Sequence, residues 1–242
     1  MKREDFLKQG LRTIGVFTVL PAFSACKKEA ETIVPDNTNI NSDPTVTPAS
    51  CTVTNSETAG PFPTKSPKDY VLQNIISDRT GNPLTVKVYV RNVSNNCAII
   101  KDAVVDIWHC DAAGEYSEYG GSGMQAANHT SEHFLRGRQS TDANGMAAWK
   151  SIFPGWYSGR APHIHVHIYN GSGTSLLVTQ IAFPQDICNT VYAQGVYKSH
   201  GLQDTTNAKD NVFGDGVTTE LGTITGNISD GYELIHTIYV KA

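Results

Sequence analysis

The sequence predicts an all-β protein, a β-sandwich with short helical or loop insertions. Glycine and proline are frequent, with 21 and 11 among the 242 residues, and no long stretch shows the apolar repeat of an amphipathic helix. From Cys51 onward, short segments of alternating apolar and polar residues are separated by turn-forming residues. Several short strands joined by glycine-rich turns are typical of two packed sheets.

The alternating segments give the expected strands in order. Residues 84–92 (LTVKVYVRN) alternate most regularly, because Leu or Val occupies every second position on one face. TDANG before Met146 and NGSG after Tyr169 predict turns, and residues 186–194 (DICNTVYAQ) predict a short helix. The other expected strands are 103–110, 146–153, 163–169, 175–183 and 232–240.

The first 26 residues are expected to be an export signal rather than part of the fold. Two basic residues precede an apolar run that is too short to cross a bilayer as a helix. The run ends at Cys26, where FSAC resembles a bacterial lipobox, so we expect a periplasmic or membrane-anchored lipoprotein of a bacterium. A plain cleaved signal peptide is the alternative. Residues 27–48 are polar and rich in Thr, which predicts a flexible tether before the domain at 49–242.

The charge pattern does not indicate a nucleic-acid-binding protein. The net charge is −4, and the 19 Lys and Arg residues form no cluster of the kind such a surface needs. Besides Cys26, the chain contains Cys51, Cys97, Cys110 and Cys188. This even number is compatible with two disulfides in an exported protein, and the absence of CxxC spacing favours structural roles over metal binding.

The segment PGWYSGRAPHIHVHIY places His163, His165 and His167 at alternate positions. In an extended strand these three imidazoles share one face. A lone histidine would most simply be a solvated or core residue, but two imidazoles two residues apart can bind one metal ion. Zinc sites also use this spacing, so spacing alone does not choose the metal.

Two nearby tyrosines favour iron over zinc. Tyr116 ends the segment DIWHCDAAGEY, and Tyr157 follows a Pro-Gly turn. A phenol has a pKa of about 10, so it binds only a metal ion acidic enough to hold it as phenolate, which favours Fe(III). Two phenolates and a hydroxide would balance the charge of Fe(III), whereas zinc with two tyrosines and two histidines would be unusual.

Four segments together resemble the intradiol ring-cleavage dioxygenases, the family of protocatechuate 3,4-dioxygenase and catechol 1,2-dioxygenase. These segments are ETAGPFP, AVVDIWHCDAAGEY, GRQSTDANGMAAWKSIFPGWYSGRAPHIHVHIY and TQIAFP. The resemblance covers roughly residues 51–190, and the ordered set of two tyrosines, an arginine and HxH is specific where any single element is weak. It implies a β-sandwich with one non-haem Fe(III).

The resemblance implies a role for each matching residue. The metal ligands would be Tyr116, Tyr157, His163 and His165, and Tyr157 would also act as the base that leaves the metal when substrate binds. Arg160 matches an arginine that stabilises charge on the substrate ring. Gln180 and Trp108 match residues of the substrate pocket.

The sequence also departs from the family pattern. Only Ser158 and Gly159 separate Tyr157 from Arg160, which is shorter than in aromatic-degrading members and closer to exported, short-loop relatives. His167 matches no ligand, so a supporting or structural role is expected.

The expected function is cleavage of a catechol-type ring between its two hydroxylated carbons with O2, giving a cis,cis-muconate-type product. A zinc-dependent hydrolase or hydratase that uses the histidine row is one alternative. A non-enzymatic surface β-sandwich that binds sugars or peptides is the other.

Overall fold

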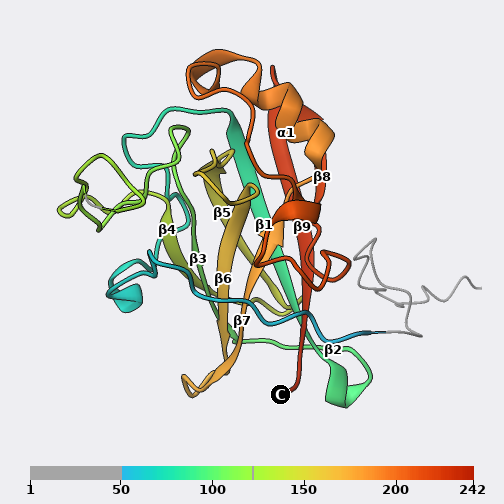
Figure 1. Cartoon of the computed structure of the whole chain (residues 1–242). Coiled ribbons are helices and arrows are strands. Elements are labelled where there is room, and N and C mark those ends of the chain that lie inside the picture. The colour runs from blue at the N-terminus through green and yellow to red at the C-terminus, as the bar shows by residue number, and fades with distance from the viewer. Residues whose placement is uncertain (1–50, 122) are drawn as a thin grey trace, which may run out of the picture. The chain divides into compact units, whose positions relative to one another are not determined.

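Two β-sheets packed face to face form the body of the protein, which confirms the predicted sandwich (Figure 1). The computed structural model describes residues 51–121 and 123–242. The expected export signal (1–26) and tether (27–48) lie outside the described residues. Within the described part of the chain, no helix is long and apolar enough to cross a membrane.

The first sheet is mixed and centres on β1. This strand pairs in parallel with β9 along one edge and antiparallel with β5 and β2 along the other, while β8 extends the sheet beyond β9. Its strands are β1 (Pro83–Asn92), β2 (Ala98–Ile99), β5 (Met146–Ile152), β8 (Thr223–Asn227) and β9 (Gly231–Val240).

The second sheet is antiparallel throughout and has the order β4-β3-β6-β7. It contains β3 (Val104–Trp108), β4 (Arg136–Ser140), β6 (His163–Tyr169) and β7 (Ser175–Ala182). The helix α1 (Gln185–Tyr192) follows β7 and buries Cys188, Val191 and Tyr192. Short 3₁₀ turns span Pro67–Asp69, Val93–Asn95, Gly195–Tyr197 and Asn207–Lys209.

The core lies between the two sheets. On β6 the side chains of Ile164, Val166 and Ile168 are fully buried in this core. Because neighbouring strand residues point to opposite faces, the histidines that alternate with them face away from the core. The second sheet therefore presents its histidine row to the outside of the sandwich, where other segments must cover it.

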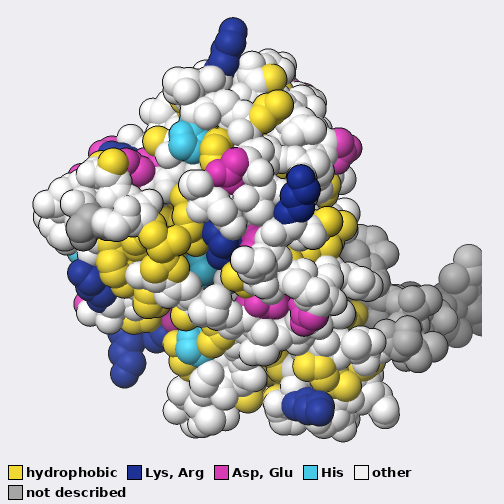
Figure 2. All heavy atoms as spheres, viewed as in Figure 1, with side chains coloured by type: hydrophobic (Ala, Val, Ile, Leu, Met, Phe, Trp, Pro, Cys, Tyr) yellow, Lys and Arg dark blue, Asp and Glu magenta, His cyan; other side chains and the backbone are white. Residues whose placement is uncertain are grey.

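All six predicted strands and the predicted helix are present, but three strands were missed. β2 has only two residues, and β8 (TITGN) is mostly exposed, so neither carries a strong apolar alternation. β4 (RGRQS) contains two arginines and a glycine, a composition that hides a strand from pattern analysis. On the face seen in Figure 2, Lys and Arg side chains occur at several separate places and form no single large patch.

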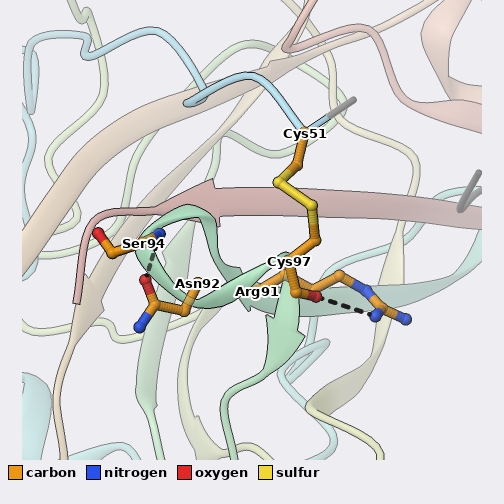
Figure 3. The surroundings of a disulfide bond; sticks show 5 residues. All are labelled: Cys51, Arg91, Asn92, Ser94 and Cys97. Carbon is orange, nitrogen blue, oxygen red and sulfur yellow. Dashed lines mark hydrogen bonds between the residues drawn. A yellow bond between two sulfur atoms is a disulfide. The ribbon is translucent and has the colours of Figure 1, made fainter. Parts of the chain in front are cut away.

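One disulfide joins Cys51 to Cys97, with the two Cα atoms 6.0 Å apart, and it fixes the start of the described chain beside the end of β1 (Figure 3). The even number of cysteines was compatible with two disulfides, but the second disulfide does not form. Cys110 and Cys188 are free and buried. They belong to different apolar clusters, one beside the candidate site and one in the main core, so both behave as small apolar core residues.

Removing the disulfide is expected to lower the free energy of unfolding by about 2 to 4 kcal/mol, because the bond closes a loop across 46 residues of sequence separation. The test is urea unfolding of a double variant, Cys51→Ser with Cys97→Ser. Wild type with its disulfide reduced is the matched control and should unfold like the variant. Equal stability of the oxidised wild type and the variant would contradict the expectation.

Candidate active site

The candidate site is built on one row of residues that crosses all four strands of the second sheet. Trp108 on β3 pairs with Arg136 on β4 and with His165 on β6. His165 in turn pairs with Gln180 on β7. Residues paired directly across antiparallel strands point to the same face of the sheet. Since Ile164 next to this row faces the core, the row lies on the outer face.

The two histidines of the HIH motif are buried and neutral. Burial holds the pKa of His163 and His165 well below the usual value, and the charge of Arg160 lowers both further. His163 Nδ1 lies 2.6 Å from the carbonyl oxygen of Ala161, so Nδ1 carries the proton and Nε2 keeps a free lone pair. The Nε2 atoms of the two histidines are 3.1 Å apart. His165 Nδ1 is buried without a hydrogen-bond partner.

Tyr116 and Tyr157 bring their phenol rings to the same place. Tyr116 is fully buried, and its Oη lies 3.4 Å from His163 Nε2. The ring of Tyr157 lies 5.8 Å from that of Tyr116 and 5.8 Å from that of His163, measured between centroids. Burial raises the pKa of both phenols, and the Arg160 guanidinium opposes this rise. Without a cation both tyrosines are therefore held as neutral phenols.

Arg160 is aimed at this group by two buried partners. Its Nε donates to both carboxylate oxygens of Asp210, at 2.9 and 3.0 Å, and its Nη2 donates to Gln180 Oε1 at 2.5 Å. The remaining nitrogen, Nη1, lies 3.3 Å from Tyr157 Oη and 3.4 Å from His163 Nε2. The Asp210 side chain is fully buried, so this ion pair is not a surface salt bridge.

The segment ETAGPFP at residues 57–63, called here the entry segment, covers the outer face of the row. Gly60 has a φ of +69°, and a Cβ at this position would lie 2.9 Å from Cε1 of His165. Phe62 stacks on Tyr116 with the ring centroids 4.7 Å apart and meets Tyr157 edge-on. The close approach of the backbone to the imidazole explains why a glycine is needed here.

Trp108 and Gln180 are both buried against protein groups. Trp108 stacks in parallel on His165, with the centroids 4.8 Å apart, and forms a wall that fixes the imidazole plane. Gln180 uses its oxygen for Arg160 and its Nε2 for the carbonyl oxygen of Thr58, at 2.9 Å. The structure therefore gives both residues supporting contacts, and their contact with substrate stays a prediction.

The donor set fits a metal ion that prefers nitrogen and charged oxygen ligands. Tyr116 and Tyr157 can each supply a phenolate, and His163 and His165 can each supply a neutral imidazole. The bare lone pair of His163 Nε2 points toward a second ring nitrogen and a phenol oxygen within 3.1 to 3.4 Å. A cation placed among these atoms would replace weak or unmade hydrogen bonds. The four predicted ligands are thus neighbours, and their role as ligands stays a prediction.

His167 lies on the same strand face but is held by other partners. Its ring nitrogens bond to Ser175 Oγ at 2.8 Å and to Tyr169 Oη at 2.9 Å. The ring also stacks on Tyr169, with the centroids 3.9 Å apart. These contacts agree with the structural role expected for it.

Three residues that support the site were not predicted to do so from the sequence. Asp210 lies 50 residues after Arg160, in a polar loop that carries no local signal for a buried ion pair. Arg136 is buried and donates to the carbonyl oxygens of Phe62 and Ser117, tying the entry segment to the loop after Tyr116. Gly60 stands inside the GPFP motif, which was the available signal for it.

Comparisons with known proteins show which family this chain belongs to. A sequence model described as Dioxygenase matches residues 58–215. The chain therefore belongs to this dioxygenase family. The match includes the entry segment from Thr58, the four predicted ligands, Arg160 and Asp210.

Solved structures that are similar to this chain include intradiol ring-cleavage dioxygenases. An intradiol ring-cleavage dioxygenase from Tetranychus urticae is 27% identical, with a TM-score of 0.70 over 79% of this chain and 95% of its own. The dioxygenase domain of a dioxygenase carbohydrate-binding fusion from Streptomyces sp. SirexAA-E is 23% identical, with a TM-score of 0.59 over 79% of this chain and 99% of its own.

The 3-chlorocatechol 1,2-dioxygenase from Rhodococcus opacus 1CP is 20% identical, with a TM-score of 0.51 over 77% of this chain and 72% of its own. At this lower identity, as for the Streptomyces domain, the likeness shows a shared fold. A comparison with curated protein sequences gives no match. The resemblance to intradiol ring-cleavage dioxygenases seen in the sequence motifs is confirmed.

Gly60→Ala is expected to disturb the candidate site as well as the fold. A left-handed φ costs alanine about 1 to 2 kcal/mol, and the contact with His165 adds an overpacking cost of about 1 to 3 kcal/mol. Gly173→Ala is the matched control, because Gly173 has a φ of +87° and open space around its Cβ position. Unfolding measurements and metal content of both variants test this. If the two variants lose equal stability and keep equal metal, Gly60 does not position His165.

Proposed function

We propose that this chain is an Fe(III)-dependent intradiol dioxygenase that cleaves a catechol-type ring between its two hydroxylated carbons with O2. The expected product is a cis,cis-muconate-type diacid. The observation that carries the proposal is the convergence of two phenols and two neutral imidazoles on the outer face of β6, next to an arginine whose free nitrogen points at them. Membership of the dioxygenase family supports the same reaction class.

Tyr116, Tyr157, His163 and His165 would hold the iron. When bound, Fe(III) would withdraw electron density from the catecholate, which opens the ring to attack by O2. The two phenolates supply negative charge that the neutral imidazoles cannot, and this favours a trivalent ion over a divalent one. Trp108 keeps the His165 ring in one plane, so the protein's contribution is a fixed geometry.

The contacts of the two tyrosines differ, and the difference supports different roles. Tyr116 is fully buried, and its Oη faces His163. Tyr157 is slightly exposed, and its Oη receives a hydrogen bond from Arg160. If Tyr157 left the metal when substrate bound, Arg160 would still stabilise its oxygen. Tyr157 is therefore suited to accept a proton from the entering catechol.

Arg160 would stabilise negative charge on the bound substrate. Its Nη1 is the one nitrogen of the guanidinium that faces the metal donors, because Asp210 and Gln180 hold the other two. The rigid fork of an arginine held on two sides cannot swing away, so the positive charge stays where the ring would lie.

Export of the protein belongs to the same proposal. The disulfide between Cys51 and Cys97 supports an oxidising compartment, where such bonds persist. The motif that ends at Cys26 supports anchoring by a lipid. An exported enzyme would meet its catechol substrate outside the cytoplasm.

The first test is metal analysis with a visible spectrum and a catechol assay. Two phenolates on Fe(III) are expected to give a visible charge-transfer band and a red to burgundy protein. Cleavage is expected to consume one O2 per catechol and to add the mass of two oxygen atoms to the substrate. A colourless protein that contains only zinc and leaves catechol intact would defeat the proposal in favour of a zinc hydrolase.

The second test separates the two tyrosines. Tyr157→Phe removes the base but keeps the ring, so turnover is expected to fall by about 10²- to 10⁴-fold while iron and part of the colour remain through Tyr116. Tyr116→Phe removes a ligand that stays bound throughout, so iron retention and colour should suffer first. Turnover rate, iron content and spectra of both variants are compared. A Tyr157→Phe enzyme with wild-type turnover shows that Tyr157 is not the mobile ligand.

A further inference from the structure

Three carboxylates meet near the candidate site without taking part in it. Glu57 belongs to the entry segment, while Asp215 and Glu220 belong to the loop before β8. One oxygen from each lies within 4.8 Å of the others. The group runs from the surface to the interior, because Asp215 is exposed, Glu57 is half-buried and Glu220 is 0% exposed. Figure 2 shows acidic side chains on the face where the two segments pass each other in Figure 1.

Glu220, the deepest of the three, lacks a countercharge. Its Oε1 accepts a long hydrogen bond of 3.3 Å from Thr179, and its Oε2 is buried with no hydrogen-bond partner. Among the described residues, no ion pair with a Lys, Arg or His is made by Glu57, Asp215 or Glu220. A buried carboxylate in this position is strongly destabilised unless a proton or a cation neutralises it.

The like charges act on one another. Burial, and then the charge of Asp215, raise the pKa of Glu57 to about 7. Burial, and then the charge of Glu57, raise the pKa of Glu220 to about 8. Arg160 lowers the pKa of Glu57 and Asp210 raises it again, so the ion pair of the candidate site offsets the rise only in part.

Backbone and amide hydrogen bonds hold the carboxylates together in spite of their repulsion. Asn55 N donates to Thr219 Oγ1 at 3.0 Å, and Asn55 Nδ2 donates to the carbonyl oxygen of Gly216 at 3.2 Å. The backbone N–H of Glu57 bonds to Val178, and the carbonyl oxygen of Glu220 bonds to the N–H of Ala182, both on β7. The carboxylate cluster is thus preformed by the fold.

We infer that Glu57, Asp215 and Glu220 form a binding site for a hard divalent cation, for which Ca²⁺ is the probe. Carboxylate oxygens are the ligands that Ca²⁺ prefers, and it accepts irregular oxygen sets that water completes. The exposed Asp215 gives the ion a route from solvent, and the unpartnered Oε2 of Glu220 gives it an anchor. This inference does not depend on the proposed dioxygenase activity, because the three carboxylates are separate from the iron ligands.

A cation here would join two segments that support the candidate site. The entry segment holds Gln180 through the carbonyl oxygen of Thr58, and the loop before β8 holds Arg160 through Asp210. Bridging Glu57 to Asp215 would replace repulsion between these segments with attraction. Arg160 and Gln180 would then be held more rigidly, although the cation would make no contact with the predicted iron ligands.

The test is Ca²⁺ titration of the full chain in chelator-treated buffer, followed by calorimetry and thermal unfolding. Saturable binding is expected with a Kd of about 10⁻⁴ to 10⁻³ M, the range of weak extracellular calcium sites. At a hundredfold excess over Kd the unfolding midpoint should rise by about 5 to 10 °C. Asp215→Asn should weaken binding at least about tenfold, the loss expected when one of three charged ligands is removed. Asp69→Asn, an exposed aspartate far from the cluster, should bind as wild type does.

Two further variants keep the inference falsifiable. Glu220→Gln removes the buried charge, so it should unfold no earlier than wild type without Ca²⁺ and should lose the calcium response. His163→Ala removes a predicted iron ligand and should keep the calcium response. No saturable binding by wild type overturns the inference. Binding that survives Asp215→Asn but is lost in His163→Ala also overturns it, because Ca²⁺ would then occupy the iron site.

Discussion

The register of the four-stranded sheet is the constraint on which the candidate site depends. Trp108, His165 and Gln180 stand side by side only because β3, β6 and β7 pair at these positions. The side-chain period of a strand is two residues, so a slip of β6 by one would turn Ile164 outward and bury a histidine in the apolar core. Selection for a packed core and selection for a site on the outer face therefore fix the same register.

The electrostatics of the site follow from what surrounds the row. Asp210 neutralises Arg160 where both are buried, so the pair adds no net charge to the interior. Burial keeps the two imidazoles uncharged and the two phenols protonated. The candidate site is thus built from neutral groups, and only its two phenols would become anionic ligands, if a cation took the place of their protons. A site of this kind would favour an ion acidic enough to displace those protons.

Local patterns made much of the fold and part of the site predictable. Alternation revealed β1 and β6, and the HIH motif with its neighbouring tyrosines pointed to the four side chains that the fold brings together as candidate metal ligands. The remaining contacts are long-range. Asp210 binds Arg160 across 50 residues of sequence. The strand β4 was not predicted because its two arginines interrupt the apolar alternation, although the fold buries or pairs both of them. The free thiols show the same limit, because an even count of cysteines says nothing about which ones the fold brings together.

Irregular segments complete the site, and this explains its dependence on buried polar bonds. The entry segment and the loop before β8 lie outside the strands and make only a few backbone hydrogen bonds to β7. Single buried side-chain contacts add to these bonds. Gln180 and Arg136 donate to the carbonyl oxygens of Thr58 and Phe62 in the entry segment, and Asp210 in the loop before β8 binds Arg160. Single buried bonds hold a position firmly only while every partner stays in place. A charge that pushes these two segments apart would therefore loosen Arg160 and His165 together, although neither residue carries that charge.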